Sequence, residues 1–427
     1  MDSEKVITPR KKVGGDINVP GSKSYAQRAI ALCALGEDRL TLSKLTECDD
    51  VNAALGIIEN LGSSIRHEGD LIHIEGGIKK KEKYSINSGE AGLSTRLFSA
   101  FSLLTDQQYI VNGKGSILTR PMDMVIDALS QLGKSVKSKQ GKLPLQISGE
   151  TKSGELKLDG STSSQLLTGI LIVAPFLDFD LNIEVDNLKS IPYIEMTLEV
   201  MRDFGLSVDH EEYRHFKVKG NQSIKRSNVY EVEGDWSGAS FLIVAALVGG
   251  DLKMKGLNKN SSQADQAMLN VVKKAGGFFS WEGNDLIVKT NELTPFKFDA
   301  THCPDLFPPL VALAAMISGE SRITGVHRLK HKESDRASAL IQEFSKLGID
   351  VSMVEDDLVV NGLHFDQLID GGCVDSHNDH RMAMALSLMS LRSGKEILIS
   401  RPESIKKSYP LFFEDFDQIT KESVQND

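Results

Sequence analysis

The feature that most constrains the fold is an internal repeat with a period of about 70 residues. Six segments each open with small or polar residues and then become strongly apolar, and their starts recur at this spacing. Such a pattern predicts helices that are buried on most sides. The six segments are Ser22–Gly36, Glu90–Leu104, Ser161–Phe176, Trp236–Gly250, Pro304–Gly319 and Asn378–Gly394.

A second set of predicted helices alternates with the first and is amphipathic. From Asp50 to Leu61 the apolar residues recur at helical spacing, and Gly62 supplies the stop. The members of this set are Asp49–Gly62, Met122–Gly133, Ile191–Gly205, Ala264–Gly276 and Lys332–Gly348, with Tyr409–Ile419 as a weaker sixth.

Short β-rich segments follow the glycine stops and complete a β-α-β-α-β-β unit that repeats six times. These segments are Leu71–Glu75, Leu145–Ser148, His215–Lys219, Asp285–Lys289 and Leu358–Asn361, and a further strand is expected at Val13–Val19. Three units on each side of a boundary near Tyr230–Asp235 predict two similar α/β domains. The alternatives are a doubly wound sheet and a solenoid, and paired helices at near-constant spacing favour closed domains over both.

Composition limits the class of protein. At 427 residues the chain is too long for one ordinary core, in agreement with two domains. The net charge of −10 argues against a nucleic-acid surface, so any cluster of cations is placed against the overall trend. The four cysteines include no CxxC pair, which predicts a reducing compartment and no zinc site. The chain shows no signal peptide and no long apolar run, so we expect a cytoplasmic protein without a membrane segment.

Cationic and polar residues lie at the starts of the apolar helices, where packing of a hydrophobic core does not require them. Lys23, Ser24 and Arg28 open the first of these helices. The N-terminus of a helix already favours an anion, so the added cations predict a seat for phosphate or carboxylate groups. A cap or a solvated side chain is the simpler explanation for each residue alone, but the set indicates a pocket for more than one anion. Its other members are Gly92, Arg96, Arg120, Ser163, Ser164, Gln165, Asp305 and 378–381.

The densest motif is the run 331–336, which contains both cations and carboxylates. Lys332 and Arg336 are four residues apart on a predicted helix, and Glu333 lies on an adjacent face. Asp305 and Glu333 can divide the roles of base and acid if their environments separate their pKa values. A salt-bridged helix start is the alternative. No metal is expected, because the histidine pair in 377–380 has no third ligand at a suitable spacing.

Several of these motifs together resemble the enolpyruvyl transferase family, and within it the EPSP synthases. They are PGSKSYAQR at 20–28, STSSQLL at 161–167, SIPYIEMTL at 190–198, HKESDR at 331–336, NDHRMAMALSL at 378–388 and KKSYPLFFEDF at 406–416. The resemblance runs from about Ile7 to Phe416. It implies two inside-out α/β domains, 20–233 and 1–19 with 234–427, which are joined by a hinge that the chain crosses twice and which close on the substrates.

The same resemblance implies the reaction. The enolpyruvyl (1-carboxyvinyl) group of phosphoenolpyruvate would pass to the 5-hydroxyl of shikimate-3-phosphate, giving 5-enolpyruvylshikimate-3-phosphate and phosphate, in the pathway to chorismate and aromatic amino acids. The resemblance implies a monomer that needs no metal or organic cofactor.

Roles for single residues also follow from the resemblance. Asp305 would be the base at the 5-hydroxyl, Glu333 a proton donor near the methylene carbon, and Lys23 a contact of both substrates. Shikimate-3-phosphate would contact Lys23, Ser24, Arg28, Ser163, Ser164, Gln165, Ser190, Asp305 and Lys332. Phosphoenolpyruvate would contact Lys23, Gly92, Arg120, Gln165, Arg336, Arg381 and Lys407.

Two positions depart from the family pattern. Glu90 stands beside the phosphoenolpyruvate subsite, where many members carry Asn. Arg328 stands where many carry Asn or a similar polar residue, and it is therefore left out of the site. Gly92 would admit glyphosate, and Glu90 leaves the sensitivity to glyphosate open.

Three other functions are weighed against this one. A sister enzyme transfers the enolpyruvyl group to UDP-N-acetylglucosamine and uses a loop cysteine, which the segment 113–120 lacks. A P-loop phosphotransferase needs Gly directly before the lysine, and Ser22 stands before Lys23. A catalytically inactive repeat scaffold has no need of Lys23, Asp305, Glu333 and Arg381 together.

Overall fold

The computed structural model describes residues 3–152, 154–161, 163–226, 229–330 and 332–420. The chain divides into two compact units. The terminal unit consists of Met1–Pro20 and Glu233–Asp427, and the middle unit is Gly21–Val232. The chain therefore leaves the terminal unit after Pro20 and re-enters it after Val232.

One set of helices is buried on nearly all sides. Every residue of α9 and of α11 is buried, as are most residues of the others. These helices have no continuous polar stripe, so they are stable only when other elements surround them. They are α1 (Lys23–Leu35), α3 (Gly92–Ser99), α5 (Gln165–Val173), α7 (Trp236–Gly249), α9 (Phe307–Ala315) and α11 (His380–Leu388).

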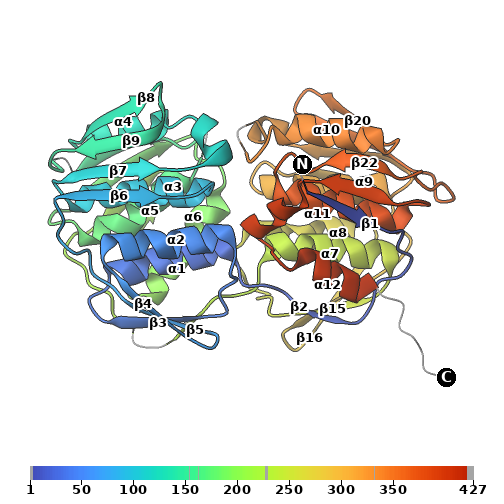
Figure 1. Ribbon diagram of the computed structural model, residues 1–427, viewed down its shortest axis with the longest axis horizontal. Helices are drawn as coiled ribbons and strands as arrows, with labels where there is room; N and C mark the ends of the chain where they lie inside the picture. Colours follow the sequence, from blue (N-terminus) through green and yellow to red (C-terminus); the bar gives the residue numbers. More distant parts are fainter. Residues whose placement is uncertain (1–2, 153, 162, 227–228, 331, 421–427) are drawn as a thin grey trace. The chain divides into compact units, whose positions relative to one another are not determined.

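The second set of helices is amphipathic. The helix α2 buries Val51, Ala54 and Ile58 on one face and leaves polar residues on the other. In Figure 1, α1 and α2 lie side by side within the middle unit. The set comprises α2 (Asp49–Leu61), α4 (Asp123–Gln131), α6 (Ile191–Asp203), α8 (Met268–Lys274), α10 (Arg336–Lys346) and α12 (Phe412–Thr420).

Among the described residues, six small sheets pack on these helices, three in each unit. In the middle unit the strand orders are β14-β3-β5-β4, β6-β7-β9-β8 and β10-β11-β13-β12. The bounds are β3 (Arg39–Ser43), β4 (Ser64–Glu68), β5 (Leu71–Glu75), β6 (Lys83–Asn87), β7 (Gln108–Asn112), β8 (Ser135–Lys139), β9 (Lys142–Ser148), β10 (Glu155–Asp159), β11 (Leu181–Asp186), β12 (Asp209–Glu211), β13 (His215–Val218) and β14 (Tyr230–Glu231).

In the terminal unit the strand orders are β16-β17-β15-β2, β18-β19-β21-β20 and β1-β23-β22. The bounds are β1 (Glu4–Ile7), β2 (Asp16–Asn18), β15 (Leu252–Lys255), β16 (Phe278–Glu282), β17 (Asp285–Lys289), β18 (Lys297–Asp299), β19 (Gly319–Thr324), β20 (Asp350–Val354), β21 (Asp357–Gly362), β22 (Gly372–Asp375) and β23 (Ile397–Ser400).

The four-stranded sheets follow one plan, which agrees with the predicted repeat. In the second sheet of the middle unit, β6 and β7 are parallel and α3 connects them. Parallel neighbours need such a crossover connection. The chain then runs through α4 into the antiparallel pair β8 and β9, and β9 pairs with β7. Strands such as β6, β10 and β11 bury alternate residues, so one face of each sheet meets the helices.

Two strands pair with a different repeat from the one that follows them in the chain. β2 precedes α1 but is parallel to β15, with Ile17 opposite Met254. β14 precedes α7 but is parallel to β3, with Tyr230 opposite Leu42. The two ends of the middle unit are therefore held together by main-chain hydrogen bonds.

The sixth repeat corrects the prediction of six identical units. β22 and β23 form the expected parallel pair, but the next strand of that sheet is β1, antiparallel to β23 with Val6 opposite Leu398. Among the described residues after β23 there is a helix, α12, and no hairpin. The N-terminal segment takes the place of that hairpin.

Several predicted helices begin later than the sequence pattern indicated. Lys332 is not helical, because α10 begins at Arg336 and Asp335 caps it through the Ser338 N–H. Likewise α5 begins at Gln165 rather than Ser161. Polar side chains that bond to nearby backbone groups favour such caps over helix interiors. Further differences include α8 from Met268, α11 from His380, α9 from Phe307 to Ala315, and the 13–19 strand shortened to β2 with an isolated bridge at Val13.

Within the described residues, no helix is long and apolar enough to cross a membrane.

Candidate active site

In the middle unit, Arg28 on α1 is almost completely buried. Its guanidinium donates to Thr197 Oγ1 at 2.9 Å, to the Tyr193 carbonyl at 3.0 Å and to the Ser24 carbonyl at 2.8 Å. The partners found within the described residues are thus neutral oxygens, and burial lowers the pKa of Arg28 to about 10. Since a buried charge without an opposite charge is costly, this site favours an incoming anion.

Two arginines and a glutamine converge on Gly92, the first residue of α3. A Cβ atom at this position would lie 2.9 Å from Arg120 Nη1, 3.2 Å from Arg96 Nη1 and 3.5 Å from Gln165 Oε1. Arg96 also donates to Gln165 Oε1 at 3.0 Å. The absence of a side chain at Gly92 leaves the helix N-terminus open between two guanidinium groups. This geometry suits an anion.

The three serines expected at a phosphate lie at helix starts. Ser163 Oγ accepts a hydrogen bond from the Gln165 N–H at 3.2 Å and so caps α5. Ser164, also buried, precedes the first residue of α5 without a side-chain capping bond. Ser190 precedes α6 with a φ of 58°, in the left-handed region. That conformation costs a non-glycine residue on the order of 1 kcal/mol or more and is found preferentially at functional sites.

Lys23 differs from Arg28 because a carboxylate already balances it. Its Nζ donates to Asp50 Oδ2 at 2.8 Å, and both side chains are only 14% exposed. Asp50 lies in the first turn of α2, and α1 and α2 pack together. An anion that binds Lys23 must therefore compete with Asp50.

Glu90 lies against the turn that leads to Arg120. Its Oε2 accepts a hydrogen bond from the Ser116 N–H at 3.2 Å. A Cβ atom on Gly115, whose φ is 58°, would lie 2.3 Å from Glu90 Cδ. The carboxylate of Glu90 thus packs on the 3-10 turn Gly115–Thr119, and Arg120 is the next residue.

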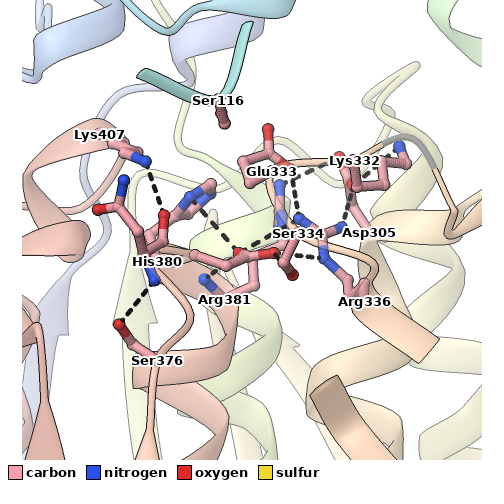
Figure 2. A network of polar contacts seen from close by, with 12 residues as sticks. Ser116, Asp305, Lys332, Glu333, Ser334, Arg336, Ser376, His380, Arg381 and Lys407 are labelled. Atoms are coloured by element: carbon pink, nitrogen blue, oxygen red, sulfur yellow. Dashed lines mark hydrogen bonds and ion pairs between the residues drawn. The ribbon is translucent and has the colours of Figure 1, made fainter. Parts of the chain in front are cut away.

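In the terminal unit, Asp305 accepts from three cations at once. Lys332 Nζ lies 3.2 Å from Oδ1, Arg336 Nη1 lies 2.9 Å from the same oxygen, and Arg381 Nη2 lies 3.2 Å from Oδ2. Burial alone would raise the pKa of Asp305, but Arg381, Lys332 and Arg336 hold that pKa well below its usual range. Figure 2 shows these side chains gathered around the carboxylate. Asp305 is therefore an ionised group.

Arg336 connects three carboxylates although it is fully buried. It donates to Glu333 Oε2 at 2.6 Å and to Asp379 Oδ2 at 2.9 Å, besides Asp305. Burial disfavours its charge, yet Asp379, Glu333 and Asp305 together raise the pKa of Arg336. Asp379 in turn accepts from the Arg381 N–H at 3.0 Å and so caps α11.

Two lysines border this network. Burial lowers the pKa of Lys332, against the opposing effect of Asp305. Lys407 Nζ donates to the carbonyl of Asn378 at 2.6 Å, in the turn before α11. Among the described residues, no group of three His, Cys, Asp or Glu side chains is arranged to hold a metal ion.

Comparison with known protein families identifies the relatives of this chain. The sequence model of the family described as EPSP synthase (3-phosphoshikimate 1-carboxyvinyltransferase) matches residues 7–416. The chain belongs to the EPSP synthase family. The predicted resemblance to the enolpyruvyl transferases is thereby confirmed.

Relatives named 3-phosphoshikimate 1-carboxyvinyltransferase match the chain over nearly their whole length. The protein of Clostridium acetobutylicum is 35% identical over 411 residues, 95% of each chain. That of Haemophilus influenzae strain PittGG is 35% identical over 429 residues, 97% of this chain and 99% of the relative.

Solved structures show the same fold. The EPSP synthase of Acinetobacter baumannii matches with a TM-score of 0.82 and 24% identity, over 98% of both chains. The enolpyruvyl transferase NikO of Streptomyces tendae matches with a TM-score of 0.77 and 16% identity, also over 98% of both.

The residues expected for an EPSP synthase site fall into two groups. The middle unit holds Lys23, Ser24, Arg28, Gly92, Arg120, Ser163, Ser164, Gln165 and Ser190. The terminal unit holds Asp305, Lys332, Glu333, Arg336, Arg381 and Lys407. The prediction that Lys332 and Arg336 are neighbours on one helix is wrong, and Asp305 brings them together instead. His331 lies outside the described residues.

Asp50 and Asp265 were not predicted from the sequence, and Asp379 was predicted only as part of the run 378–381. Asp50 pairs with Lys23, and Asp379 pairs with Arg336. Asp265 is buried and interacts electrostatically with Asp305 and Arg381. An acid in the first turn of a helix is a detectable signal for Asp50, as is a cap position for Asp379. No local signal marks Asp265.

Proposed function

We propose that the chain uses the two groups of residues above for the reaction of its family. That reaction transfers the enolpyruvyl (1-carboxyvinyl) group of phosphoenolpyruvate to the 5-hydroxyl of shikimate-3-phosphate and releases phosphate. Full-length membership of the EPSP synthase family gives the chain this activity, in the shikimate pathway to aromatic amino acids.

The middle unit holds shikimate-3-phosphate in this proposal. Arg28 supports the assignment, because a buried guanidinium with neutral oxygen partners is stabilised by an anion. Ser163, Ser164 and Ser190 at their helix starts supply further donors, and Lys23, Ser24 and Gln165 complete the set. Asp305 and Lys332 of the terminal unit contact the hydroxyl side of the ring.

Phosphoenolpyruvate carries a carboxylate and a phosphate, so it needs several cations. Arg120 and Gln165 beside Gly92 provide part of this set in the middle unit. In the terminal unit Arg336, Arg381 and Lys407 provide the rest. Lys23 contacts both substrates.

Two carboxyl groups of the terminal unit divide the proton transfers. Glu333 gives a proton to C3 of phosphoenolpyruvate, which leaves an oxocarbenium-like centre at C2. The 5-hydroxyl oxygen bonds to C2 while Asp305 takes the hydroxyl proton. In the second half of the reaction C3 returns a proton to the Glu333 carboxylate, the C–O bond to phosphate breaks, and the double bond forms again.

The ion pairs of Asp305 control its strength as a base. In the structure described here three cations hold its pKa well below the usual range, so the carboxylate is ionised but weakly basic. Substrate anions that draw Arg336 and Arg381 away would raise the basicity of Asp305. The base would thus become effective only when phosphoenolpyruvate is bound.

The finer fold assignment is part of the same proposal. Residues 20–233 act as one inside-out α/β domain and residues 1–19 with 234–427 as the other, with a hinge crossed twice by the chain, and the enzyme acts as a monomer. The pairing of β2 with β15 and of β14 with β3 supports the two crossings.

The test is phosphate release from phosphoenolpyruvate, with shikimate-3-phosphate and UDP-N-acetylglucosamine offered separately. Release only with shikimate-3-phosphate is the expected result. Release only with the sugar nucleotide would keep the fold and overturn the substrate. No release with either would favour a scaffold without catalytic activity.

A further inference from the structure

Asp265 is a buried carboxyl group that the proposed reaction does not use. It lies in the 3-10 turn Ala264–Ala267 before α8 and is only 2% exposed. Its Oδ2 accepts a hydrogen bond from Ser237 Oγ, while its Oδ1 has no hydrogen-bond partner among the described residues. An ionised carboxylate with one hydroxyl as its donor would be poorly compensated at such depth.

The charges around Asp265 also favour its neutral form. Asp305 and Asp235 are the acids that face it, and Arg381 is the cation. Burial in the first place, and then Asp305, raises the pKa of Asp265 to about 7, while Arg381 and the Ser237 hydroxyl oppose the rise.

In the neighbouring ion network, the three cations Lys332, Arg336 and Arg381 already pair with other acids. These acids are Asp305, Glu333 and Asp379, with direct distances of 2.6 to 3.2 Å. Ionised Asp265 would therefore compete with Asp305 for a cation. That cation is Arg381, which interacts electrostatically with Asp265.

We propose that Asp265 is a positioning residue for Arg381: its carboxyl leaves Arg381 with Asp305 while it is protonated and draws Arg381 away from Asp305 when it ionises. The inference rests on the proposed role of Arg381 as a contact of phosphoenolpyruvate. Asp265 touches no substrate in this scheme. It acts through the charge that it presents to Arg381.

The consequence is a pH dependence confined to one substrate. As the pH rises through about 7, ionisation of Asp265 turns Arg381 away, and the KM for phosphoenolpyruvate rises on the order of tenfold, the effect of weakening one contact by about 1.4 kcal/mol. The KM for shikimate-3-phosphate changes less, because Arg381 is not among the residues proposed to contact that substrate.

The experiment uses the full-length enzyme and two readouts. Difference infrared spectroscopy over a pH series detects the carbonyl band of a protonated carboxyl group, and steady-state kinetics gives both KM values and kcat over the same series. In the wild type the band disappears as the pH passes about 7, and the KM for phosphoenolpyruvate rises in parallel.

Two variants make the assignment specific. Asp265→Asn is neutral at every pH, so the infrared band is missing and the rise in KM is abolished. Ser237→Ala removes a hydrogen bond that favours the ionised form, so both transitions move to higher pH. Asp299→Asn is the matched control, because Asp299 belongs to the same unit and accepts from the Thr301 N–H instead. It should leave both transitions unchanged.

Three results would overturn the proposal. One is an infrared titration in which no carboxyl group titrates near neutral pH, or in which the group that does so is still present in Asp265→Asn. Another is a wild-type rise in KM that persists in Asp265→Asn. The third is an Asp265 titration that moves in Ser237→Ala while the KM profile does not follow. The infrared readout needs no turnover, so failure of the proposed function would be visible separately.

Discussion

Arg28 and Arg336 are both buried arginines, but the protein balances their charges in opposite ways. Arg28 in the middle unit donates to neutral oxygens, and burial lowers its pKa to about 10. Arg336 in the terminal unit donates to three carboxylates, which raise its pKa in spite of burial. The first guanidinium has only neutral oxygen partners among the described residues, whereas the second is bonded to three of the protein's own acids.

This difference separates binding from proton chemistry. A cation that lacks a carboxylate gains most from a substrate phosphate, so the middle unit is suited to capture an anion. In the terminal unit the cations already pair with acids, and three of these cations hold the pKa of Asp305 well below its usual range. Under the proposed function, the two units contribute different kinds of charge to one reaction.

The largest effect we expect is on stability, and it differs between the two arginines. Arg336→Gln leaves three carboxylates without their shared cation and should cost about 3–5 kcal/mol of unfolding free energy. Arg28→Gln removes a charge that has no carboxylate partner in the described structure, so its cost should stay below about 2 kcal/mol. Urea unfolding at pH 7 measures both. Equal losses would show that Arg28 is also compensated within the protein.

The next effect concerns turnover. Asp305→Asn removes the base while keeping the shape of the side chain, so kcat should fall by about a hundredfold or more. The KM values should change much less. Asp299→Asn is the control for loss of an acid near the same helix start. Near-full turnover in Asp305→Asn would exclude Asp305 as the base.

Arg28→Gln should also weaken the binding of shikimate-3-phosphate. Charge-assisted hydrogen bonds to a phosphate contribute about 1.5–3 kcal/mol each, so the Kd should rise about tenfold to a hundredfold. Isothermal titration calorimetry measures it. Arg226→Gln is a matched control in the same unit, since Arg226 stacks on Phe204 and Tyr230. A similar loss in both variants would indicate a general electrostatic effect rather than a specific contact.

The same contrast explains what the sequence could predict. Apolar runs such as 236–249 must be buried, so the repeat and most helices could be identified from spacing alone. The start of α10 could not be identified in this way. Asp335 caps the helix through the Ser338 N–H, so the helix begins after Asp335 and Lys332 stays outside it. The positions of turns and caps depend on side-chain to backbone hydrogen bonds, and the spacing of apolar residues along a helix gives no information about these bonds.

Within the site, the motifs identified the cations, the serines and the acids Asp305 and Glu333, but not Asp50 or Asp265. Asp379 lies far from its partner Arg336 in sequence, and Asp265 lies far from Arg381. The spacing of Asp265 to its neighbours in sequence is not distinctive. Their partners are set by how α7, α9 and α11 pack against one another. Charge balance is a tertiary property, and it could be read only after the fold was known.

Glu90 provides a smaller test within the middle unit. Glu90→Ala removes the acceptor of the Ser116 N–H and the packing on Gly115, so the turn before Arg120 should loosen. The KM for phosphoenolpyruvate should rise on the order of tenfold, the effect of one lost hydrogen bond of about 1.5 kcal/mol. Glu90→Gln keeps an acceptor oxygen and should lie within about threefold of the wild type. If Glu90→Gln were as impaired as Glu90→Ala, the negative charge rather than the hydrogen bond would matter.

The smallest expected effect tests Lys23, a cation of the middle-unit site that pairs with an acid. Asp50→Asn removes the carboxylate that holds Lys23 at 2.8 Å, so Lys23 should become more available to the substrates. Shikimate-3-phosphate should then bind about threefold more tightly, the effect expected when a competing ion pair of roughly 0.6 kcal/mol is lost. Asp49→Asn, at the neighbouring exposed position, removes the same charge without this contact. Tighter binding in both variants would mean that net charge is responsible. Weaker binding in Asp50→Asn alone would mean that Asp50 positions Lys23 for the substrate, and the middle unit would then resemble the terminal unit more closely than Arg28 indicates.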